Sequence, residues 1–223
     1  MSSAYITRSV KRLSIAAVLL AFVMLAPIMQ PVLAGQEIAL HFGSPLVPGG
    51  ERAIDISQAD TTLLDLLTVQ VWKVTDDSMN LVATITQSTR PPEHLHLGDP
   101  YYHGLWKPAK GMTGSFQVTV DVAGLSLGGE TFTLTQRAGV PIKILIDNNP
   151  IIRAHALTVR GFSATAIADV LLEEFGLPAE ETAQLLFNEG HSPEDVALAL
   201  KLVYALLAEA TASILRIVGY AAS

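Results

Sequence analysis

The chain of 223 residues contains no cysteine. This absence excludes disulfide bonds, a thiolate nucleophile, and the zinc, iron–sulfur and c-type haem sites that depend on cysteine. Any transition-metal site must therefore use imidazole and carboxylate ligands, and the chain has six histidines. The length allows one or two domains with hydrophobic cores, so the lack of disulfides does not imply low stability.

Basic side chains are also scarce. The chain has 14 Lys and Arg against 21 Asp and Glu, a net charge of −7, which argues against nucleic-acid binding through a basic face. The nucleotide-binding pattern G-x-x-x-x-G-K-[ST], the zinc-protease pattern H-E-x-x-H and an EF-hand loop are absent from the sequence. None of these common catalytic or calcium-binding mechanisms has a sequence basis here.

The first 34 residues have the features of a secretory signal peptide. Three basic residues between positions 8 and 12 precede an apolar run at 13–26, and Ala34 stands just before a cleavage point at Gly35. A membrane span needs roughly 20 apolar residues, so we predict cleavage and a secreted or cell-surface protein without a stable membrane span. An uncleaved anchor is the alternative. Without residues 1–34 the chain carries 11 basic and 21 acidic groups, or −10.

Residues 35–150 show the alternating pattern of β-strands, interrupted by turn-forming clusters. The clearest segments are 69–74, 81–86, 116–122, 131–135 and 142–146, and weaker ones are 38–42 and 53–56. About seven short strands predict an antiparallel β-sandwich of immunoglobulin-like size. The Cys–Trp–Cys signature is missing, so this prediction concerns architecture alone.

Residues 151–223 are rich in Ala, Leu and Glu and have a helical pattern. Modules 161–189 and 190–218 align without a gap at a shift of 29, with ten identical residues. The predicted fold class is therefore α+β in separate domains, a sandwich followed by a small all-α helical-repeat domain.

Each module predicts two short helices joined by a turn. Ser163 and Ser192 are candidate N-caps, and Gly176 closes the first helix of the first module. Ala205 replaces that glycine in the second module. Because alanine does not break helices as glycine does, a continuous helix over 193–218 is the alternative.

Three similar tripeptides open successive modules: Gly161-Phe162-Ser163, Gly190-His191-Ser192 and Gly219-Tyr220-Ala221. They resemble the short Gly-Tyr-Ser helix–turn repeats of some exported microbial proteins. The resemblance covers about 60 residues at the C-terminal end, implies a repeat architecture and transfers no activity. Helical arrays need three or more units, or polar caps, to cover their apolar faces. We therefore expect self-association or binding to another extracellular protein.

Residues 93–106 hold the densest polar cluster and are predicted to form a long loop. His94 and His96 lie two residues apart, so an extended segment points them to one side, and His103 can return across a turn. Three imidazoles suit Zn²⁺ or Cu²⁺, with Glu93 or Asp99 completing the ligand set. The alternative is a chance His-x-His in a proline-rich loop.

The same segment contains three aromatic residues, Tyr101, Tyr102 and Trp106. Exposed rings on a loop could stack on a sugar or contact a protein partner. The alternative is a loop held in place by packing its own rings onto the sheet. An extracellular binding module for a metal ion or a carbohydrate is therefore the second candidate function.

A hydrolase is the third candidate, because residues 124–128 match the nucleophile pattern G-x-S-x-G around Ser126. Asp147 followed by His155 or His191 would complete a triad. The motif nevertheless joins two alternating strands and is better explained as a hairpin turn. The prediction is thus a secreted, non-enzymatic structural or assembly protein of a surface or matrix, with no catalytic residue or cofactor, and with the helical repeat as its contact module.

Overall fold

The computed structural model describes five stretches of the chain: 40–43, 46–47, 59–98, 100–135 and 139–220. The predicted signal peptide, the weak strand at 53–56 and the candidate ligand Asp99 lie outside the described residues. No helix among the residues described is long and apolar enough to cross a bilayer.

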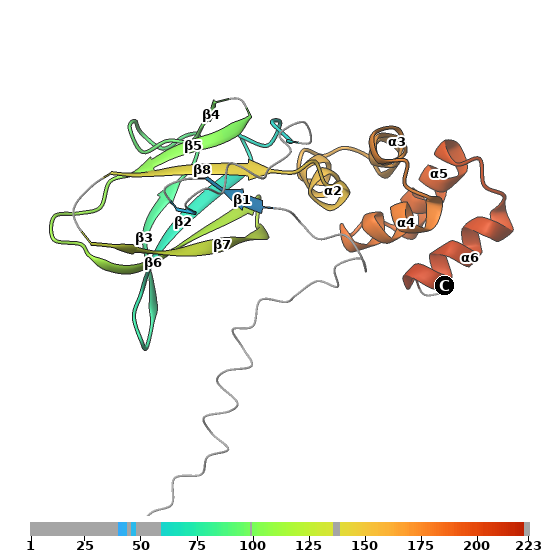
Figure 1. Cartoon of the computed structure of the whole chain (residues 1–223). Helices are drawn as coiled ribbons and strands as arrows, with labels where there is room; N and C mark the ends of the chain where they lie inside the picture. Colours follow the sequence, from blue (N-terminus) through green and yellow to red (C-terminus); the bar gives the residue numbers. More distant parts are fainter. Residues whose placement is uncertain (1–39, 44–45, 48–58, 99, 136–138, 221–223) are drawn as a thin grey trace, which may run out of the picture. The chain divides into compact units, whose positions relative to one another are not determined.

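Two four-stranded antiparallel sheets pack face to face (Figure 1), which confirms the predicted sandwich. The strand order is β1-β8-β5-β4 in one sheet and β3-β2-β6-β7 in the other. The strands are β1 (Leu40–Phe42), β2 (Leu67–Val74), β3 (Met79–Ile85), β4 (His96–Gly98), β5 (Tyr101–Trp106), β6 (Gly114–Val122), β7 (Leu125–Leu134) and β8 (Val140–Ile146).

The core forms because alternate residues of each strand point inward. Val69 on β2 lies opposite Val120 on β6, and both are fully buried. At one place the core is aromatic, with the Phe116 ring centroid 5.0 Å from that of Trp106 and 5.8 Å from that of Phe132. The apolar residues that point inward at every second position account for the regular alternation seen in the sequence.

The predicted loop at 93–106 is instead largely a hairpin, formed by β4 and β5. His96 pairs with His103, and Leu97 with Tyr102, in antiparallel register. Proline, glycine and histidine in this segment hide the strand signal, because these residues are uncommon in strand interiors. The strands are nonetheless paired, since β5 also hydrogen-bonds with β8.

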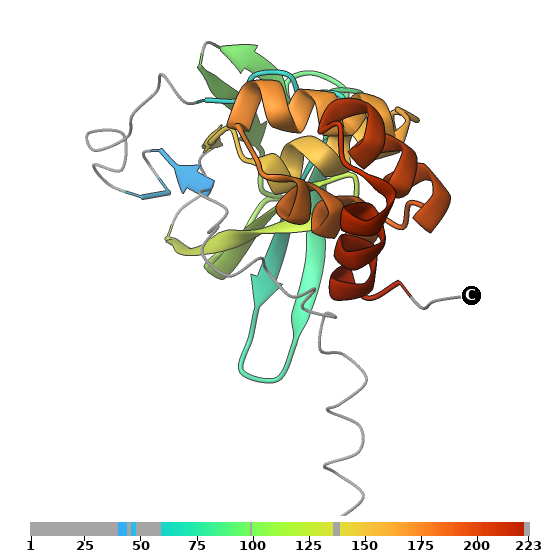
Figure 2. The same cartoon turned by 90° about the vertical axis from the view of Figure 1, so that its right-hand side faces the viewer.

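Five helices follow the sandwich and pack on one another (Figure 2), so the predicted α+β fold class, with the helices after the strands, is confirmed. They are α2 (Pro150–Val159), α3 (Ala164–Phe175), α4 (Ala179–Asn188), α5 (Pro193–Val203) and α6 (Ala208–Val218). Packing contacts join α2 to α4 and α4 to α6 in one row, and α3 to α5 in another.

The helices repeat with the 29-residue register of the sequence. Ser163 and Ser192 cap α3 and α5 by accepting a hydrogen bond from the amide three residues later. The turns after α2, α4 and α6 each contain an equivalent backbone bond, from the N–H of Phe162, His191 and Tyr220 to the C=O of Leu157, Leu186 and Leu215, respectively. Since α2 shares this pattern, the array holds two and a half units.

Ala205 does end a helix, so the alternative of one continuous helix over 193–218 is wrong. Its φ of 53° lies in the left-handed region, close to the 64° of Gly176 at the equivalent turn. The flanking bond is also conserved between the modules, from Leu177 N–H to Leu171 C=O and from Leu206 N–H to Leu200 C=O. The backbone path of the repeat therefore overrides the helical preference of alanine.

Matched substitutions at these two turns should change stability in opposite directions. A left-handed alanine is strained by about 1 kcal/mol relative to glycine. We expect Ala205→Gly to stabilise the protein by about 0.5–1 kcal/mol and Gly176→Ala to destabilise it by about 1 kcal/mol. Urea unfolding followed by far-UV circular dichroism measures both. A loss of stability in Ala205→Gly would contradict the strained turn.

Candidate functional site

The three histidines proposed as metal ligands lie close together, His96 and His103 on the β4–β5 hairpin and His94 just before β4. The ring centroids are 5.1 Å apart for His94 and His96, and 5.6 Å apart for His96 and His103. His96 and His103 are stacked at 26°, and the His103 Nε2 lies 3.1 Å from the carbonyl oxygen of Gly98. Among the described residues, no group of three His, Asp or Glu side chains is placed to hold a metal ion. The structure thus brings the three imidazoles close together, with His96 and His103 stacked and His94 tilted against His96.

The three aromatic residues of the same hairpin divide between surface and interior. Tyr102 and Trp106 are buried in the sandwich core, at 0% and 2% exposure. Tyr101 is half-buried and makes an edge contact with His103. The expectation of three exposed rings is therefore corrected, because β5 alternates and turns every second side chain inward. Two of the rings have no face free to stack on a sugar.

The parts of the candidate hydrolase triad are not assembled. Ser126 lies in β7, directly after the β6–β7 turn, and is paired with Asp121 in the sheet. The Asp147 carboxylate contacts the His41 ring at 3.4 Å. His155 binds Glu189 instead. The strand-to-helix turn that such a nucleophile requires is absent at Ser126, because a hairpin stands in its place.

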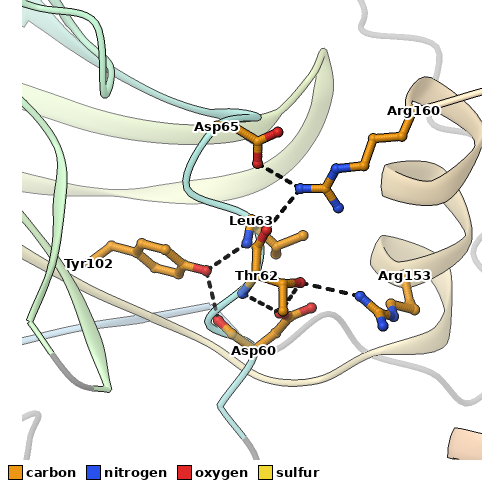
Figure 3. A network of polar contacts seen from close by, with 7 residues as sticks. All are labelled: Asp60, Thr62, Leu63, Asp65, Tyr102, Arg153 and Arg160. Atoms are coloured by element: carbon orange, nitrogen blue, oxygen red, sulfur yellow. Dashed lines mark hydrogen bonds and ion pairs between the residues drawn. The ribbon is translucent and has the colours of Figure 1, made fainter.

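A polar network joins the sandwich to the helical array (Figure 3). The buried Tyr102 hydroxyl accepts a hydrogen bond from the Leu63 N–H at 3.0 Å and donates one to the Asp60 carbonyl at 2.9 Å. Burial raises the pKa of Tyr102 far above its usual value, partly offset by the Leu63 bond. The Asp60 carboxylate accepts bonds from the Thr62 N–H and hydroxyl. Residues 60–63 are thereby fixed against β5.

Two arginines of the array, Arg153 and Arg160, bind the same turn from the other side (Figure 3). Arg160 donates to the Thr62 carbonyl at 2.8 Å and to the Asp65 carboxylate at 2.6 Å. Arg153 donates to the Thr62 hydroxyl and forms a two-point ion pair with Glu174 of α3. The network therefore serves to dock α2 and α3 on the sandwich, and sequence reasoning identified none of these contacts.

Helix α2 is buried on two sides. Ile152 and Ala156 belong to the sandwich core, whereas Ala154 and Leu157 are buried outside that core. The secondary structure thus changes from strands to helices at Pro150, but the hydrophobic core of the sandwich extends past Pro150 into α2.

His155 of α2 adds an ion pair within the array. Its Nδ1 lies 3.0 Å from the Glu189 carboxylate, which raises the pKa of His155 despite the opposing effect of burial. The buried Nε2 makes no hydrogen bond to the described residues, although the backbone carbonyls of Ala123 and Val122 also favour the protonated form. The His155 ring therefore ties α2 to the end of α4 and lies beside the β6–β7 turn.

The far end of the array, at α6, is less well covered by the described residues. Ala154, Ala183 and Ala212 occupy equivalent positions of α2, α4 and α6, and each is followed three residues later by leucine. The first two alanines are fully buried, but Ala212 is exposed and Leu215 only half-buried. The reason is the order of the helices in the row. Helix α4 packs against α2, and α6 packs against α4, but no described helix packs against the next side of α6. We call the face of α5 and α6 that would receive a further helix the open end.

The chain matches no family model, no curated protein and no solved structure.

Helix α5 also has residues that are less buried than their equivalents in the first module. Ala168 of α3 is fully buried, while the identical Ala197 of α5 is only half-buried. Leu177 is 7% exposed, and the equivalent Leu206 is half-buried. The open end thus keeps the residues that the first module uses for packing, but none of the helices that the structure describes lies against them.

At three positions the last module exposes an apolar residue where the first module has a polar one. Leu198, Leu202 and Ile217 are 49%, 61% and 72% exposed. The first module has Asp169, Glu173 and Asn188 at the equivalent positions. Large exposed apolar patches are a general feature of protein contact surfaces. The sequence alone could have revealed this apolar surface, because an alignment of the two modules shows apolar residues in the second copy where the first copy has polar ones.

Proposed function

We propose that the protein is an exported, non-enzymatic assembly protein, in which the sandwich is the body and the helical array is the contact module. One observation carries the proposal: the open end presents the same Ala and Leu residues that are buried inside the array, and no helix of the described residues packs on them. Arrays of helical units need their terminal faces covered by a polar cap or by a partner. Self-association would cover this face.

The composition of the chain supports the same proposal. The signal-peptide pattern at 1–34 favours export, and the acidic array, with Lys201 and Arg216 as the sole basic residues of 161–220, disfavours nucleic acid as the partner. The exposed Leu198 and Leu202 widen the apolar surface of the last module. A surface or matrix setting would supply the high local concentration that weak self-association needs.

Two alanines of α6 provide a matched test of the contact module. Ala212 lies in the open end, and its equivalent in the first module is the buried Ala183. Ala210 is exposed too, but its equivalent is the exposed Glu181, so glutamate is already accepted there. Ala212→Glu and Ala210→Glu therefore make the same chemical change on the same helix.

Sedimentation velocity of the purified protein over a range of concentrations measures the outcome. We expect the wild type and Ala210→Glu to associate, and Ala212→Glu to sediment as a monomer with unchanged circular dichroism. A monomeric wild type at every concentration would refute the proposal, and so would an Ala212→Glu variant that associates as the wild type does.

A further inference from the structure

The two ends of the helical array differ in what they can bind. Its first helix, α2, contributes Ile152 and Ala156 to the sandwich core and is fastened by Arg153 and Arg160. That end is therefore covered. Within the part of the chain that the structure describes, the end formed by α5 and α6 is the one left open.

We propose that two chains pair open end to open end, with α6 antiparallel to α6 of a second copy around a two-fold axis near Ala212. The inference rests on the proposed self-association and adds its geometry. A head-to-tail contact would need the opposite end of the array, which the sandwich occupies. With one open end among the described residues, the contact is the same surface on both partners, and assembly stops at the dimer.

The residues of α6 suit this pairing. A small side chain at Ala212 lets two helices approach closely, with interaxial distances of about 8 Å at the low end of the usual range. Leu215 lies three residues further along and so on a neighbouring line of the helix surface. Both side chains would be buried in the pair, as Ala183 and Leu186 are buried between α4 and its neighbours.

The charged residues of α6 are placed symmetrically about the proposed two-fold axis. Glu209 lies in the first turn and Arg216 in the last, and both are exposed. They are seven residues apart, about two helical turns, with their midpoint between Ala212 and Ser213. An antiparallel two-fold pair centred there places Glu209 opposite the partner's Arg216, twice. A parallel pair would instead place like charges together.

The absence of cysteine makes the geometry directly testable. A single Ala212→Cys can form a disulfide with the same residue of the second copy only if the two lie within about 7 Å between Cα atoms, that is, beside the axis. With diamide as oxidant, we expect most of the Ala212→Cys protein to become a covalent dimer on non-reducing gels. Glu173→Cys, exposed on α3, serves as the control and should remain largely uncross-linked.

Charge reversal provides the second arm of the experiment. Glu209→Arg should raise the dimer dissociation constant at least fivefold, and Glu209→Arg combined with Arg216→Glu should restore it. A wild type that dimerises without cross-linking at position 212 and without this rescue would overturn the two-fold geometry while leaving self-association intact. A monomeric wild type would overturn both. Particles larger than dimers that grow with concentration would show head-to-tail contacts and also overturn the geometry.

Discussion

Ile152→Ala should destabilise the whole protein by about 3 kcal/mol, because the side chain is fully buried in the sandwich core although it belongs to a helix. Removing it leaves a cavity between α2 and the strands, and the better helical preference of alanine recovers about 0.4 kcal/mol at most. For a domain of this size, the loss lowers the melting temperature by about 6–12 °C.

Two probes during thermal unfolding distinguish a shared core from two independent domains. Circular dichroism at 222 nm follows the helices, and the fluorescence of Trp72 and Trp106 follows the strands. We expect both signals to shift together in Ile152→Ala. Val159→Ala, at the exposed end of the same helix, should change stability by less than about 0.5 kcal/mol. Helices that melt alone, with the fluorescence transition unchanged, would contradict the shared core.

Tyr102→Phe is expected to cost about 2–4 kcal/mol, since it retains the buried ring and removes both hydrogen bonds of the hydroxyl. The Leu63 N–H and the Asp60 carbonyl would then lie in the interior without partners, and each lost partner costs about 1–3 kcal/mol. Because Thr62 sits between them and binds both arginines of the array, docking of α2 should weaken as well.

Urea unfolding of Tyr102→Phe and of a neighbouring control measures this effect. Tyr101→Phe keeps the ring that contacts His103 and lies on the half-buried side of β5, so its stability should change by less than about 0.5 kcal/mol. Equal midpoints for the two variants would show that the buried hydroxyl contributes little to the junction.

Local sequence patterns predict those parts of the fold that depend on local interactions. The alternation in β2, β6 and β8 reflects side chains that point in and out in turn, and the caps at Ser163 and Ser192 depend on an amide three residues away. The β4–β5 hairpin escapes prediction because its glycine and histidine residues have little strand preference. Pairing of β5 with β8, about 40 residues later in the chain, stabilises it instead.

The candidate site is harder to predict because it depends on distant contacts. Tyr102 looks like a binding residue until its partners, Leu63 and the Asp60 carbonyl, are known, and these lie 39 and 42 positions away. The open end poses a different difficulty. Ala183 and Ala212 are the same residue in the same repeat position, and only the packing of helices makes one buried and the other exposed.

The two-sided burial of α2 has a mechanical consequence. In the proposed assembly role, force between the helical array and the sandwich would pass through the segment that connects them. Here that connection is helix α2, which has side chains in the sandwich core and is further held by Arg153 and Arg160. It is therefore a packed helix and not a flexible linker that could extend before the core is disturbed. A pull on the array loads β8 directly through Pro150, and yielding requires rupture of the core itself.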